Sequence, residues 1–198
     1  MRRLLLACLL LGGCALERDY IEVRHVAAPG VQAIPGASEV GVTVETRDGR
    51  TIRDRVSNKI NGYGMEMAPI ISTNDVIAET QRAVVEELTS RGFRIGGSDA
   101  RLDVEVLRFF SQFRTGFFAG SANADLSVNV RLTDRSGRLV LAKTFTAEGI
   151  VPSLQLATGA NARLALEDGL RKLIRMIGDD AELAQALLRV APSGQPVS

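Results

Sequence analysis

The chain has 198 residues and a formal net charge of +1, and hydrophobic residues make up 45% of it. This composition excludes a wholly disordered chain, and the balanced charge argues against recruitment to nucleic acid. One histidine and two cysteines exclude most metal sites and most nucleophile–histidine chemistry, so we expect no metal, no cofactor and no enzymatic activity.

The N-terminus has the three parts of a bacterial lipoprotein signal. Two arginines precede a short apolar run, residues 4–11, which is too short to span a bilayer. Residues 11–14 read Leu-Gly-Gly-Cys, which resembles a lipobox, the motif whose cysteine is acylated before cleavage. We predict a lipoprotein signal peptide over residues 1–13 and palmitate-type lipidation at Cys14. The alternative is an ordinary secreted protein in which Cys14 is a free thiol.

The residue after the lipidated cysteine predicts the destination. An aspartate there tends to retain lipoproteins in the inner membrane, whereas this chain has Ala15. We therefore expect an anchor in the outer membrane, at its periplasmic face, because two or more acyl chains hold a protein stably.

Residues 14–39 are predicted to be the lipidated N-terminus and a tether. Proline, glycine and alanine punctuate this segment, and it lacks helical periodicity. The alternation from Tyr20 to Val23 is compatible with a short strand that pins part of the tether to the domain. A lone histidine in a linker is typically solvated, which is what we expect of His25.

Residues 40–190 are predicted to form a single periplasmic domain, followed by a flexible tail over residues 191–198. Alternating valines predict a strand over residues 40–44, and turn-forming residues with further apolar runs follow it. Capping side chains precede an apolar face of helical spacing, which predicts a helix over residues 75–91.

The second half of the domain has the most regular pattern in the chain. Strict alternation predicts strands over residues 102–106, 122–132 and 139–147, joined by short turns as an antiparallel meander. An amphipathic helix is predicted over residues 160–177, and a shorter final helix follows. The predicted fold class is α+β: an antiparallel β-sheet, made of the meander and the N-terminal strands, with two or three helices packed on one face.

These residues resemble the YajG family of bacterial envelope lipoproteins. The similar features are the lipobox ending at Cys14, the first core strand Val40-Gly41-Val42-Thr43-Val44, the helix end Leu88-Thr89-Ser90-Arg91-Gly92-Phe93 and the strand Leu102-Asp103-Val104-Glu105-Val106. The family has no agreed molecular activity, so the resemblance implies a location and a fold.

One segment departs from that family. Five of the seven phenylalanines lie within ten residues, namely Phe109, Phe110, Phe113, Phe117 and Phe118. One interpretation is a hydrophobic tip that docks to a membrane or a protein partner, since exposed aromatic rings often supply binding energy. The other is a local minicore packed against helix ends. We retain the segment as the candidate interaction surface.

The sequence therefore predicts a non-enzymatic accessory or assembly factor, anchored in the outer membrane, whose domain binds another envelope component. The alternative function is a carrier of a lipid or glycan ligand in a cavity between sheet and helices. A carrier requires a sizeable apolar cavity, whereas a binding module requires an open surface, so the structure can distinguish them.

Overall fold

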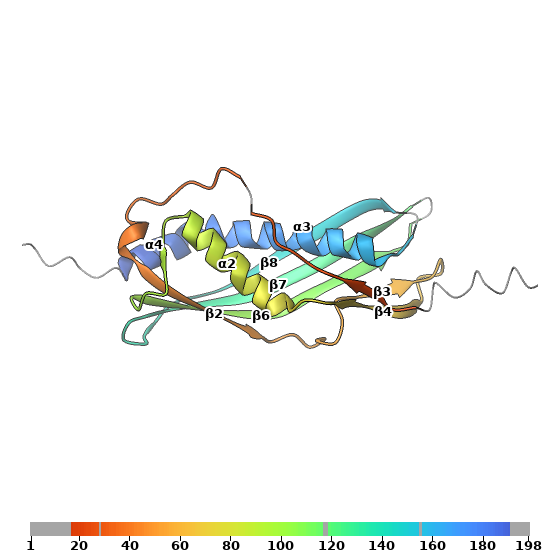
Figure 1. Cartoon of the computed structure of the whole chain (residues 1–198), viewed down its shortest axis with the longest axis horizontal. Coiled ribbons are helices and arrows are strands. Elements are labelled where there is room, and N and C mark those ends of the chain that lie inside the picture. The colour runs from red at the N-terminus through yellow and green to blue at the C-terminus, as the bar shows by residue number, and fades with distance from the viewer. Residues whose placement is uncertain (1–16, 28, 117–118, 155, 191–198) are drawn as a thin grey trace, which may run out of the picture.

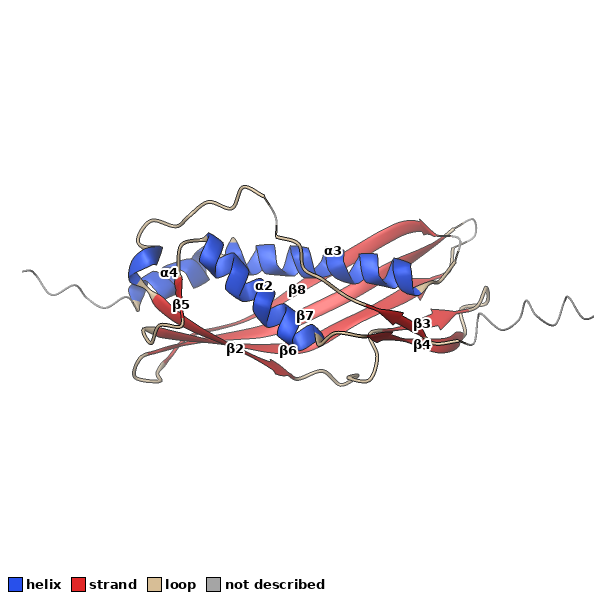
Figure 2. Cartoon of the chain, viewed as in Figure 1, coloured by secondary structure: helices blue, strands red, loops and turns tan. Residues whose placement is uncertain are grey.

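The computed structural model of the chain describes residues 17–27, 29–116, 119–154 and 156–190. One sheet of eight strands carries α2 (Val76–Ser90), α3 (Gly159–Gly178) and α4 (Ala181–Arg189) (Figure 1). Figure 2 shows the helices gathered on one side of the sheet. The predicted α+β class is confirmed.

The longest strands of the sheet form the predicted meander, built from β6 (Ala100–Arg114), β7 (Gly120–Asp134) and β8 (Leu139–Leu154). Both neighbouring pairs are antiparallel, as expected. The strands are longer than the alternation suggested, and the register of β6 against β7 shifts at Leu107. A bulge at this point bends β6 and strengthens its twist.

The strands from the first half of the chain make the sheet mixed. β2 (Gly41–Asp48) lies parallel to β6, and β5 (Arg94–Ile95) lies parallel to β2. β3 (Ser57–Ile60) and β4 (Glu66–Ser72) form a hairpin, and β1 (Asp19–Ile21) joins β4 in parallel. Two parallel strands need a crossover connection between them, which returns the chain to the same end of the sheet. Between β2 and β6, the connecting chain includes α2.

The core lies between the sheet and the helices. Thr158 caps the N-terminus of α3 by accepting a hydrogen bond from the Asn161 backbone. The buried face of α3, including Leu166 and Leu170, then covers β7 and β8, while α2 packs on β2. Each apolar surface is thus covered by another, which is the usual condition for a stable layered domain.

The first described part of the predicted tether, as far as His25, lies against the domain. Its expected short strand is present as β1, which ends at Ile21. Beyond β1, Val23 is fully buried: its N–H donates to Asn74 Oδ1 over 3.0 Å, and its carbonyl accepts from Asn74 Nδ2 over 2.8 Å. The expectation of a solvated His25 is wrong, because its side chain is only 7% exposed. The His25 backbone N–H donates to Glu79, which fixes the segment on α2.

We expect the domain to lose stability as the pH falls below about 6.5, and His25→Gln to reduce that loss. Burial lowers the pKa of His25 from its ordinary value, against the opposing effect of Glu86. The buried Nδ1 has no hydrogen-bond partner among the described residues. The unfolded chain therefore takes up this proton at a higher pH than the folded one, and stability falls from the unfolded pKa down through the folded pKa.

Urea unfolding midpoints at about pH 7.5 and about pH 5.5 measure this effect. Carboxylates with lowered pKa values, such as Glu79 and Asp168, add stability that is lost only at lower pH. An equal loss in the wild type and in His25→Gln would contradict the assignment to His25.

Candidate functional site

β8 forms one edge of the sheet and is its longest strand, with 16 residues. Among the described strands it pairs with β7 alone, and the register between them is unbroken from Leu141 to Ile150. Natural proteins usually blunt or cover an edge of this length, because its free N–H and C=O groups can pair with another chain.

The edge is covered at one end only. Lys172 Nζ of α3 donates to the Glu148 carbonyl over 3.0 Å, and the Ile150 N–H donates to Asp168 Oδ2 over 3.2 Å. These two backbone positions therefore point away from β7. In an antiparallel strand, the backbone N–H and C=O groups of every second residue point to the same side.

By this alternation, the backbone groups of Ala142, Thr144 and Thr146 also point outward. None of these outward groups is hydrogen-bonded to another residue in the described part of the chain. The side chains of all three are exposed and small. We call these three residues the open edge.

A groove of about 720 Å³ lies beside the open edge, between β8 and the C-terminal half of α3. Phe145, Ala147 and the partly exposed Met176 give it an apolar floor. The charges on its rim are largely paired within the chain: Lys143 Nζ lies 2.6 Å from Asp180 Oδ2. Hydrogen bonds to Asp180 and then Glu182 raise the pKa of Lys143, so its ammonium stays charged.

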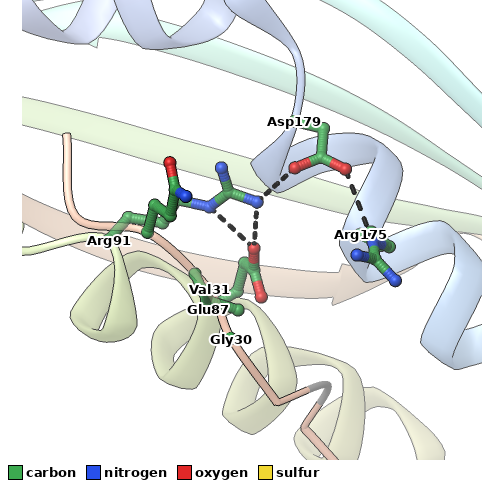
Figure 3. Close-up of a pocket in the computed structure, with 7 residues that line it drawn as sticks. Gly30, Val31, Glu87, Arg91, Arg175 and Asp179 are labelled. Carbon is green, nitrogen blue, oxygen red and sulfur yellow. Dashed lines mark hydrogen bonds and ion pairs between the residues drawn. The ribbon is translucent and has the colours of Figure 1, made fainter.

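A charged cluster at the end of α2 serves a different purpose (Figure 3). Arg91 Nε donates to Glu87 Oε1 over 2.9 Å, and Arg91 Nη2 donates to Asp179 Oδ1 over 2.5 Å. Burial by itself lowers the pKa of Arg91, but the bonds to Asp179 and Glu87 raise it overall. Arg175 pairs with Asp179 over 3.6 Å, so the charges balance. The cluster therefore joins α2 to α3 and leaves no excess charge for a ligand.

The structure describes three of the five phenylalanines of the candidate interaction surface. Phe109 and Phe110 are 2% and 7% exposed, so neither ring is displayed. Phe113 is partly buried and packs against the core. Phe117 and Phe118 lie outside the described residues, as does the predicted lipidation site Cys14.

The interface between α3 and the sheet is filled by side chains. Leu126, Leu166 and Leu170 are fully buried there. At the crossing of α3 over β8, a Cβ on Gly149 would lie 2.0 Å from the Ala165 carbonyl oxygen, so the two backbones are in direct contact. This close packing gives no support to a carrier that encloses its ligand between sheet and helices.

Other kinds of site are also missing from the described part of the chain. Its histidine, cysteine, aspartate and glutamate residues form no group of three or more suited to a metal ion. No helix within the described ranges has the length and apolar character needed to cross a membrane.

Burial alternates along β8 beyond the predicted strand, since Glu148 and Ile150 are exposed and flank the buried Gly149. The residue types do not follow this alternation, because an exposed position holds isoleucine and the buried one holds glycine, so no hydrophobic period of two marked this end of the strand. Pro152 ended the predicted strand early, although proline is compatible with an edge strand. The edge position itself depends on which strands pair, and no local pattern records that.

The fold and the close packing described above define a layered α+β domain, and comparison with known proteins identifies its family. Residues 27–188 match the family described as "Uncharacterized lipoprotein", Lipoprotein_16. The chain belongs to this family, which confirms the predicted resemblance to lipoproteins without an assigned activity. No match is found among curated proteins.

Solved structures share the fold. Protein XCC0632 from Xanthomonas campestris superimposes with a TM-score of 0.53 at 20% identity, over 88% of this chain and 96% of its own. An uncharacterised protein gives a TM-score of 0.52 at 12% identity, over 81% and 96%. A minor lipoprotein from Acinetobacter baumannii gives 0.40 at 15% identity, over 71% and 91%. At these identities, the first two support the fold alone.

Proposed function

We propose that this lipoprotein is a non-enzymatic accessory factor that binds an extended segment of another envelope protein along β8. The observation that carries the proposal is the open edge, where three consecutive outward positions of a regular strand lack partners among the described residues. Ala15 supports an outer-membrane anchor through Cys14, with the domain in the periplasm. The family supports lipid anchoring but names no partner.

Strand addition fits the chemistry of this site. The backbone N–H and C=O groups of the open edge provide affinity for any extended chain, and pockets for alternate side chains provide selectivity. An added strand would place every second side chain over the groove beside Phe145 and Met176. We therefore expect the bound segment to carry apolar residues at alternate positions.

We expect Thr144→Pro to reduce partner binding by at least about fivefold while the domain stays folded. Proline removes the outward N–H of residue 144, which β7 does not use, and its ring occupies the path of an added strand. Thr144→Val is the matched control, because it keeps the N–H and changes only the side chain. A photoreactive amino acid at Ala142, in cells, measures binding as the yield of adduct.

Thermal unfolding of each variant first establishes that the fold is kept. An adduct yield that is the same in Thr144→Pro and Thr144→Val would contradict strand addition. Adducts formed equally well from Arg131, which lies on β7 inside the sheet, would show contact with the sheet face instead of the edge.

A further inference from the structure

Three connections meet at one end of the sheet, opposite the β7–β8 turn. They are the β3–β4 hairpin, the β6–β7 connection and the chain between β8 and α3. Asn61, Thr115 and Leu156 come from these three connections and line a common cavity of about 300 Å³. The three connections are therefore neighbours in space.

The β3–β4 hairpin is held in a defined shape. Asn61 Oδ1 accepts hydrogen bonds from the backbone N–H groups of Tyr63 and Met65, each over 3.0 Å. Gly64 has a φ of 81°, a conformation that glycine adopts without strain. Tyr63 and Met65 therefore lie on a turn whose shape is fixed by hydrogen bonds.

This end of the molecule exposes large apolar side chains. Tyr63 is 91% exposed, Leu156 71% and Met65 58%. We call these three residues the apolar tip. Single exposed apolar residues are common, but a group at one extremity marks a contact surface more often than chance.

The chain also enters the domain at this end. β1 runs parallel to β4 with Asp19 opposite Ile70, so β1 is entered from the side of the hairpin (Figure 1). Asp19 is fixed there, because its carboxylate accepts a hydrogen bond from the Gly159 N–H over 2.7 Å and pairs with Lys59 Nζ over 2.6 Å.

The distance to the predicted anchor is short. Cys14 precedes Asp19 by five residues, at most about 17 Å of extended chain. The hairpin turn lies beyond Ile70, on the side of Glu66. The part of β4 between Ile70 and Glu66 is about 13 Å of strand. An acylated Cys14 can therefore lie in the membrane while the apolar tip reaches its surface.

We propose that the apolar tip is a second membrane contact, in which Tyr63, Met65 and Leu156 enter the interfacial region of the bilayer that holds the acyl chains. The inference rests on the proposed lipidation of Cys14. Tyrosine suits this position, because its ring is apolar and its hydroxyl stays hydrated. The short tether raises the effective concentration of lipid at the tip, so that weak insertion is sufficient.

The chain contains no tryptophan, so a single introduced indole reports on its own surroundings. The lipidated protein carrying Tyr63→Trp is reconstituted in vesicles of phosphatidylethanolamine and phosphatidylglycerol. We expect its emission to shift to shorter wavelength and to be quenched by brominated lipids. Leu139→Trp is the matched control, since residue 139 is 48% exposed but begins β8 at the opposite end of the sheet; its indole is expected to show neither change.

A second measurement uses a chain that begins at residue 15, which lacks both the apolar run over residues 4–11 and the anchor. Replacing all three tip residues by serine is expected to weaken its partition into the same vesicles by about tenfold or more. An unchanged partition would overturn the proposal, provided that circular dichroism shows the fold intact.

The outcomes separate this inference from the proposed anchoring. If the wild-type chain fails to acquire lipid and to bind vesicles, the anchoring through Cys14 is wrong. If the chain binds but brominated lipids leave the Tyr63→Trp indole unquenched, the tip does not enter the bilayer. Protection of that indole from aqueous iodide without such quenching would assign the tip to a protein partner and likewise overturn the proposal.

Discussion

Replacing Gly149 with alanine is expected to lower the free energy of unfolding by roughly 3 kcal/mol. Gly149 lies on β8 where α3 crosses it. A Cβ there would lie 2.0 Å from the Ala165 carbonyl oxygen and 2.4 Å from the Gly169 nitrogen. Both atoms belong to the backbone of a helix, so relief requires α3 to move away from the sheet and the core beneath it to open.

Gly62→Ala is the matched control for this substitution. Gly62 lies on the exposed β3–β4 turn, and a Cβ there would meet no heavy atom within 4 Å. We expect its free energy of unfolding to change by less than about 1 kcal/mol in urea titrations. Similar losses in both variants would mean that the contact between α3 and β8 is not as close as described.

Truncating Leu170 to alanine is expected to cost about 2–5 kcal/mol of stability. Leu170 lies on α3 and is fully buried against the sheet, so the substitution removes apolar contacts and leaves a cavity. The backbone of α3 already contacts β8 at Gly149, so the helix cannot move inward freely to fill the space. The value is measured from urea titrations, as the difference in unfolding free energy from the wild type.

Leu164→Ala on the same helix provides the comparison. The substitution makes the same leucine-to-alanine change on α3. Because Leu164 is 45% exposed, it removes little buried area. Its expected cost is below about 1 kcal/mol. If the two variants lost equal stability, the buried face of α3 would have to be reassigned.

The packing of α3 on β8 at Gly149 also limits the length of the open edge. Asp168 and Lys172 of α3 cover the backbone of β8 at residues 148 and 150. A helix displaced by Gly149→Ala would uncover those groups and lengthen the free edge. We therefore place the binding test at Thr144, beyond the covered stretch, where edge and packing can be varied separately.

The proposed membrane contact and the proposed binding edge lie at different places along the sheet. β8 ends at Leu154 near the apolar tip and passes through Ala142 twelve residues earlier, about 40 Å away at the rise of a strand. A domain held at the bilayer by Cys14 and the tip would thus present the open edge toward the periplasm.

Local patterns were sufficient for the elements of the sheet and its helices. The alternation over residues 122–132 placed β7 and its buried face correctly, because side chains of a strand point to opposite faces in turn. Capping side chains were expected before α2, and one of them, Asp75, is the cap: its carboxylate accepts from the N–H groups of Ile77 and Ala78. Both the alternation and the cap involve residues that are close in the chain, so they can be predicted without knowledge of the tertiary structure.

The tertiary structure alone decided the parallel pairing of β2 with β6, the burial of His25 and the burial of Phe109 and Phe110. Each depends on segments distant in the chain: His25 is covered because Asn74 and Glu79 hold its segment on α2. The free edge of β8 was decided in the same way, because a strand is an edge only when no other strand of the fold pairs with its second side. Hydrogen-bonding partners between strands are chosen by the packing of the whole domain, and the residues of one strand do not specify them.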